Sequence, residues 1–142
     1  MLSLLRTLIA FVLLAAFAPA PSAMAADANA SEVQGVISSQ IDAFKHEDGP
    51  KAFSFAAPEL HLVFPSSEVF MSMVRQGYPA VYSARQFQFG PFDVQGNFFK
   101  QQVEITAADG TAWTALYTLS RQPDGSLKIN GCQLVKRPGV GA

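Results

Sequence analysis

Five ionisable side chains form the group in the sequence best suited to acid–base or metal chemistry: Asp42, His46, Glu47, Asp48 and His61. Asp42 and His46 lie four positions apart, so on a helix they would share a face, where they could pair or hold a metal ion together. The sequence lacks the His-x-x-x-His and Cys-x-x-Cys spacings of metal sites. A solvated helix face explains the same pattern, and we favour it. We therefore predict no metal, no cofactor and no catalytic residue.

The other reactive side chains also have structural explanations. His61 lies among apolar residues, which is typical of a histidine at the edge of a core or on a surface. Cys132 is the single cysteine and has no base close to it in the sequence, so we predict a buried structural thiol. The alternative interpretation is an acid–base enzyme of the lyase or isomerase type, with His46, Asp42 or His61 as the base.

A second group of candidates comes from segments with strand-like alternation. In residues 98–107 one face carries apolar side chains and Gln101, while Glu104 falls on the opposite face. If the first face points inward, its lining suits an apolar core or a small hydrophobic pocket. The candidate pocket residues from this strand and from the bulkier face of residues 111–121 are Trp113, Tyr117, Gln101 and Phe99.

Three further candidates, Tyr78, Tyr82 and Arg75, flank Gly77 and Pro79 at a predicted helix-to-sheet corner. They could form the mouth of a pocket, with aromatic walls and one cation. The competing interpretation is a packed corner, in which the glycine supplies a left-handed cap and the tyrosines cover the edge of the core.

Helices are predicted in the first half of the chain. After a mobile lead-in over residues 27–30, apolar residues recur at helical spacing from Ser31 to about Lys45. Asp48 and Pro50 favour the start of a short helix that would end before Pro58. Residues 58–64 fit either a helical turn or an extended piece. Ser66 or Ser67 begins a helix that ends at Gly77 and whose apolar face consists of Val69, Phe70, Met73 and Val74.

Strands are predicted in the second half. Three tight-turn signals, at 95–97, 109–110 and 123–125, separate four segments with residue-to-residue alternation. The predicted strands are 83–94, 98–107, 111–121 and 126–136, with a bend at Gly90-Pro91 in the first. Short turns make neighbouring strands antiparallel. Helices followed by strands predict an α+β fold, with N-terminal helices packed on a curved four-stranded antiparallel sheet.

The beginning of the chain has the features of a cleaved secretory signal peptide. Arg6 precedes an apolar run, Leu8–Ala18, and Ala23-Met24-Ala25 fits a cleavage site. We predict a signal peptide over 1–25 and a single domain over 26–142, periplasmic or secreted. The apolar run is too short for a stable membrane anchor. A net charge of −1 for the whole chain gives no electrostatic case for binding nucleic acid.

The succession of helices and curled sheet resembles the cone fold of the nuclear-transport-factor-2-like superfamily, which includes ketosteroid isomerases and SnoaL-like cyclases. More specifically, the chain resembles a bacterial family of exported proteins that is defined as a domain of unknown function. The resemblance is carried by Gln40–Phe44, Ala52–Pro58, Met73–Tyr82, and Asp124-Gly125 leading into Ile129–Cys132. It implies a fold but no activity. The Asp-plus-Tyr pair of the isomerases has no inward acid to match it here.

These observations favour a non-enzymatic exported domain that binds a small apolar ligand or a protein partner. Beside the acid–base enzyme, a third interpretation is an envelope module that self-associates, as a homodimer, through its exposed sheet face. The residues expected on that face make a wet interface plausible: Lys100, Gln102, Glu104, Thr114 and Thr118.

Overall fold

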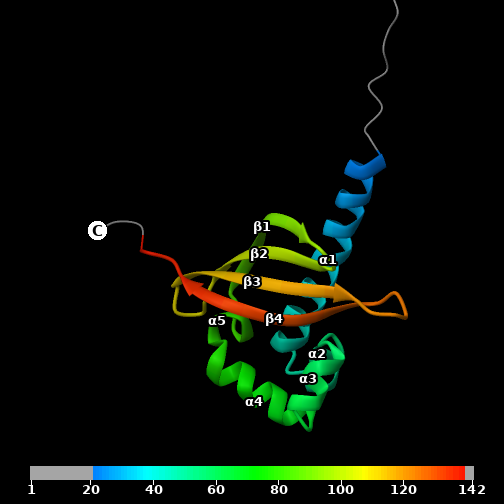
Figure 1. The fold of residues 1–142 in the computed structure, drawn as a ribbon. Coiled ribbons are helices and arrows are strands. Elements are labelled where there is room, and N and C mark those ends of the chain that lie inside the picture. The colour runs from blue at the N-terminus through cyan, green and yellow to red at the C-terminus, as the bar shows by residue number, and fades with distance from the viewer. Residues whose placement is uncertain (1–20, 140–142) are drawn as a thin grey trace, which may run out of the picture.

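The computed structural model describes residues 21–139, which form five helices followed by an antiparallel sheet of four strands (Figure 1). The helices are α1 (Pro21–Lys45), α2 (Gly49–Ser54), α3 (Pro58–Val63), α4 (Ser67–Gly77) and α5 (Pro79–Tyr82). The strands are β1 (Gln86–Gln95), β2 (Phe98–Thr106), β3 (Ala112–Arg121) and β4 (Leu127–Lys136). They pair in chain order as a meander. The predicted α+β class and the four strands are confirmed, whereas the signal peptide's Arg6 and apolar run lie outside the described residues.

Glycine turns set the sheet topology. Gly96, Gly110 and Gly125 have positive φ values of 60°, 86° and 87°, a conformation that glycine adopts without steric cost, and each lies between two strands. The register of β1 on β2 shifts between Phe89 and Phe92, which is the predicted bend at Gly90-Pro91.

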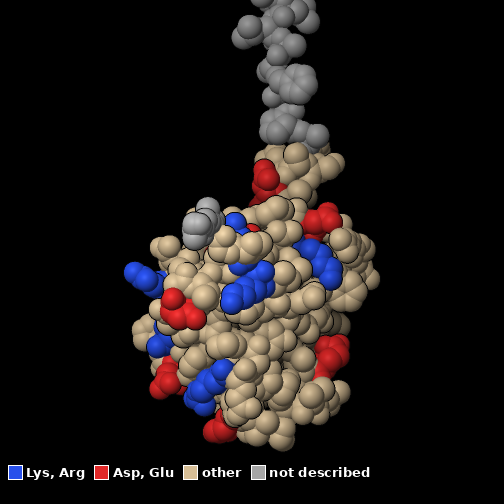
Figure 2. All heavy atoms as spheres, turned by 90° about the vertical axis from the view of Figure 1, so that its left-hand side faces the viewer, with Lys and Arg blue, Asp and Glu red and all other residues tan. Residues whose placement is uncertain are grey.

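One face of the sheet is buried beneath the helices. The predicted alternation is confirmed: Phe99, Gln101, Val103 and Ile105 of β2 are buried, as are Ala115, Tyr117 and Leu119 of β3. The helix α1 crosses behind the sheet in Figure 1 and buries Val33, Ile37, Ile41 and Phe44. An ion pair between Arg121 and Glu32, at 2.8 Å, joins β3 to α1. Figure 2 shows acidic and basic side chains interspersed on the face turned to the viewer, without a patch of one sign.

Three details of the predicted helices are wrong. First, α1 is already helical at Pro21, so the segment over 27–30 is no lead-in; it is rich in alanine, the best helix former. Second, α2 covers Gly49–Ser54, and the residues after it leave the helix to meet β4. Third, Val69 is 45% exposed on α4, whereas Met71 is buried. The buried stripe is rotated because α4 also packs against α2.

The helix caps follow the sequence. The Asp48 carboxylate accepts a hydrogen bond from Lys51 N at 3.1 Å, and Ser66 Oγ accepts one from Val69 N at 3.2 Å. The undecided segment 58–64 is helical over Pro58–Val63. Within residues 21–139, no helix is both long and apolar enough to cross a membrane.

Candidate ligand pocket

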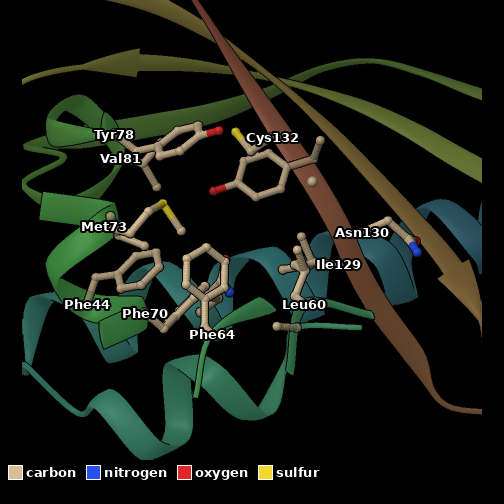
Figure 3. Close-up of a pocket in the computed structure, with 15 residues that line it drawn as sticks. Phe44, Leu60, Phe64, Phe70, Met73, Tyr78, Val81, Ile129, Asn130 and Cys132 are labelled. Atoms are coloured by element: carbon tan, nitrogen blue, oxygen red, sulfur yellow. The ribbon is translucent and has the colours of Figure 1, made fainter. Parts of the chain in front are cut away.

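A pocket of about 290 Å³ lies between the helices and strands β3 and β4 (Figure 3). Helices α1, α3, α4 and α5 contribute lining residues, as does the link between α2 and α3, so the pocket exists only in the assembled fold. Its lining residues are Gln40, Phe44, Ala56, Leu60, Phe64, Phe70, Met73, Val74, Tyr78, Val81, Tyr117, Ile129, Asn130, Gly131 and Cys132. No charged residue belongs to this described lining.

One end of the pocket is aromatic. The ring of Phe70 lies 5.8 Å from that of Phe64, edge to face, and 6.4 Å from that of Phe44. On its other side Phe70 stacks on Phe53 at 4.9 Å. Offset and edge-to-face contacts of this kind are favourable aromatic geometries. They hold α1, α2 and α4 together around an apolar wall.

The other end of the pocket is polar, and three side chains form it. Tyr117 and Cys132 are cross-strand partners in β3 and β4, and Tyr78 precedes α5. In Figure 3 the Tyr78 hydroxyl and the Cys132 sulfur point toward each other. Burial raises the pKa of Tyr117 well above its ordinary value and raises the pKa of Cys132 to about 12. Burial also raises the pKa of Tyr78. All three groups are therefore protonated at neutral pH.

Two amide side chains complete the lining. Gln40 of α1 is buried, and its Nε2 donates to the carbonyl oxygen of Ala52 at 3.1 Å. Asn130 is the extra residue at a shift of the β3–β4 register, and its side chain points away from the cavity in Figure 3. The Asn130 Oδ1 is buried without a hydrogen-bond partner. Its amide therefore adds no polar group to the interior of the pocket.

Residues 26–142 match the model of a protein family described as a domain of unknown function, DUF4864. The chain belongs to this family. It is also similar to a crystal structure of an NTF-2 like protein of unknown function from Silicibacter pomeroyi. The two share 16% sequence identity over 78% of this chain and 98% of that chain, with a TM-score of 0.56. This likeness shows the NTF-2-like fold alone. No curated protein matches the chain.

In this DUF4864 chain, two of the sequence-predicted candidates, Tyr117 and Tyr78, lie in the wall of the pocket. Trp113 and Phe99 share the inward face with Tyr117, but they lie toward the two ends of the β2–β3 ladder. Trp113 pairs with Ile105, and Phe99 pairs with Leu119. The Trp113 Nε1 donates to Thr111 Oγ1 at 2.8 Å.

Gln101 is buried, and its side-chain amide is hydrogen-bonded to other protein groups. Its Oε1 accepts from Gln34 Nε2 at 3.2 Å, and its Nε2 donates to the carbonyl oxygens of Gly90 at 3.0 Å and Gln102 at 2.8 Å. A further contact reaches the Pro91 carbonyl at 3.3 Å. This glutamine braces the bend of β1. It does not belong to the lining of the pocket between the helices and the sheet, but it borders a second hollow at that bend.

Arg75 and Tyr82 lie on the outside of the corner. Arg75 Nε donates to the Tyr82 hydroxyl at 3.0 Å, and that hydroxyl donates to Glu47 Oε1 at 2.8 Å. The predicted cation at the pocket mouth is thus held elsewhere, in a link between α4, α5 and the end of α1. The suggested left-handed cap at Gly77 is wrong, because the backbone φ of Gly77 is not positive; Pro79 ends the helix by opening α5 directly.

The histidines and their acidic neighbours lie outside the pocket. His46 and Asp42 pair at 3.5 Å, with side chains 72% and 59% exposed. His61 is exposed and stacks on Phe53 at 3.8 Å. Within residues 21–139 no three His, Cys, Asp or Glu side chains are placed to hold a metal ion.

Sequence reasoning missed most of the helical wall, including Leu60, Phe64, Phe70 and Met73. Their apolar character alone is what any core residue shows, so no signal in the sequence separates wall from core. Cys132, for which the sequence predicts a buried thiol, is half-buried, and its position beside Tyr117 follows from the strand register.

A second hollow, of about 480 Å³, lies where the polar outer face of the sheet meets the bend of β1. Lys100 Nζ donates there to Thr118 Oγ1 at 2.9 Å. Because Lys100, Gln102 and Gln133 belong to its lining, this part of the outer face is polar. A homodimer through it stays a prediction.

Proposed function

We propose that this protein is an exported, non-catalytic domain whose pocket binds a small apolar ligand. The observation that carries the proposal is a pocket of about 290 Å³ with aromatic and aliphatic walls and no charged residue in its described lining. At roughly 30 Å³ for each non-hydrogen atom, the share of one molecule in liquid water, the pocket would hold roughly ten such atoms. Mostly apolar concave sites with a few polar groups are typical of small-molecule binding.

The protonation state of Tyr117 and Cys132, at the polar end of the pocket, favours ligand binding over acid–base catalysis. A general base works best when its pKa lies near the operating pH, but the pKa of Cys132 is about 12 and that of Tyr117 is raised well above its ordinary value. The residues suggested as bases, His46, Asp42 and His61, are exposed and do not line the pocket. An enzyme using them would have to hold its substrate on the outer surface of the helices.

Two observations support export with cleavage after Ala25. The match to the family begins at residue 26, directly after the predicted cleavage site. Residues 21–28 of α1 are all exposed, and the first buried residue of that helix is Val33, so among the described residues cleavage removes only exposed ones, 21–25. The intact mass of protein purified from the cell envelope should correspond to a chain that begins at Ala26. Recovery of a chain that still begins at Met1 would contradict export with cleavage.

Ligand binding can be tested with naphthalene, a neutral apolar probe of the expected size, by NMR titration of the mature protein. We expect saturable binding with the largest shifts at pocket residues. Met73→Trp should fill the cavity and weaken binding at least about tenfold, because the half-buried Met73 lines the wall. Val69→Trp is the matched control, since Val69 lies on the same helix but is 45% exposed. Absence of saturable binding, or equal effects of the two substitutions, would overturn the proposal.

A further inference from the structure

The two ends of the pocket differ in chemistry. Phe44, Phe64, Phe70 and Leu60 lie at one end in Figure 3, whereas the Tyr78 hydroxyl and the Cys132 sulfur lie at the other. Tyr117 adds its hydroxyl beside Cys132, its cross-strand partner. A ligand that fills this cavity would therefore place most of its surface against rings and one end against hydroxyl groups.

The hydroxyl groups at the polar end are donors with poor protein partners. Tyr117 is 1% exposed, and its hydroxyl lies beside the thiol of Cys132, its cross-strand partner. A thiol sulfur is a weak acceptor, so an oxygen acceptor on a ligand would be a better partner for this donor. Tyr78 is half-buried at the same end. Both tyrosines have raised pKa values because of burial, which keeps both hydroxyls able to donate.

The described lining offers no charge to balance an anionic ligand. Its members include neither lysine nor arginine, and the nearby Arg75 is engaged with Tyr82 on the outside. Burying a carboxylate without a counter-charge is far more costly than burying a neutral polar group. Hydrogen bonds from the tyrosine hydroxyls would offset only part of the free-energy cost of burying a carboxylate.

We propose that the pocket selects a neutral, largely apolar ligand with one hydrogen-bond acceptor, such as a ketone or ester carbonyl, and that Tyr117 and Tyr78 anchor this acceptor. The inference rests on the proposed ligand-binding function and sharpens it by naming the ligand class. It implies that carboxylates of the same shape are rejected.

Three isosteric probes test the inference: benzylacetone, which carries a ketone; hydrocinnamate, which carries a carboxylate; and isopentylbenzene, a hydrocarbon. Their affinities for the mature protein are measured by NMR titration at neutral pH. We expect benzylacetone to bind roughly three- to tenfold more tightly than isopentylbenzene, the gain of one neutral hydrogen bond. Hydrocinnamate should bind at least about tenfold more weakly than benzylacetone.

Substitution of the anchor separates its role from that of the cavity. Tyr117→Phe should remove the preference for benzylacetone over isopentylbenzene and leave the affinity for the hydrocarbon unchanged, and Tyr78→Phe should reduce that preference. Tyr82→Phe is the matched control, because Tyr82 does not line the pocket, and it should leave all three affinities unchanged.

The possible failures are distinguishable. If none of the three probes shifts the pocket residues, both the ligand-binding function and its refinement are wrong. If the hydrocarbon binds as tightly as the ketone and Tyr117→Phe changes neither affinity, the pocket stands and the anchor is refuted. If hydrocinnamate binds most tightly, the selection of neutral ligands is refuted.

Discussion

The inward face of the sheet has two regions, one beneath α1 and one beside α3 to α5, and they differ in how they treat buried polar groups. Gln101 and Tyr117 are direct cross-strand partners in β2 and β3, and both are 1% exposed. The Gln101 amide is engaged by a side chain of α1 and by backbone carbonyls. The Tyr117 hydroxyl meets a thiol and an open pocket. Burial of a polar group thus says little about function until its partners are known.

The same substitution in the two regions gives the largest expected contrast. Leu119 is fully buried on the inward face of β3, so Leu119→Ala should lower the free energy of unfolding by about 2–5 kcal/mol. Leu60 is half-buried and already borders an open cavity, so Leu60→Ala removes fewer contacts and should cost less than about 2 kcal/mol. Urea unfolding of both variants measures the difference. Equal costs would mean that the pocket region is packed as tightly as the region beneath α1.

Replacing the paired polar residues sharpens the comparison. Gln101→Leu leaves the Gly90 carbonyl and the Gln34 side chain without their partner, and it should cost about 1–3 kcal/mol of stability. Tyr117→Phe removes a hydroxyl that lies beside a thiol, a weak hydrogen-bond acceptor, so its cost should stay below about 1 kcal/mol. Thermal unfolding of both variants provides the test. A larger cost for Tyr117→Phe would show that its hydroxyl supports the fold.

A further small effect is a loss of stability at alkaline pH that originates in the pocket region. The pKa of Cys132 rises from its ordinary value of 9.0 to about 12 in the fold. Above pH 9 the unfolded chain loses this proton while the folded chain keeps it, so the free energy of unfolding falls as pH rises toward 12. Between about pH 7 and 9.5 the loss should be roughly 1 kcal/mol.

The control for this pH effect is Cys132→Ala, which removes the titrating thiol. Its stability should fall less steeply than that of the wild type over the same interval, whatever the starting value. Parallel curves would show that the thiol is not held protonated by its surroundings.

The local sequence determines much of this fold, but the pocket depends on how elements dock. Turn glycines and alternation predict each strand to within three residues of its observed bounds, because those signals act over a few positions. The start of α1 is mispredicted because its alanine-rich first turns are helical without a buried face to signal them. The exposure of Val69 is mispredicted because it depends on how α4 packs against α2. Alternation places Trp113, Tyr117 and Gln101 on one face, yet it cannot say which of them a helix covers. Only docking of α1 and α4 decides that.

The short parallel bridge between Ala56 and Ile129 has a consequence for the order of folding. Ala57 N donates to the Ile129 carbonyl, and Ile129 N donates to the Phe55 carbonyl, both at 2.8 Å. These bonds join the link between α2 and α3 to the last strand, so the cavity closes only after nearly the whole chain is available. Contacts between such distant segments form slowly. If the protein is exported unfolded, as proposed, it would therefore cross the membrane before the pocket exists, and any ligand would bind only after export.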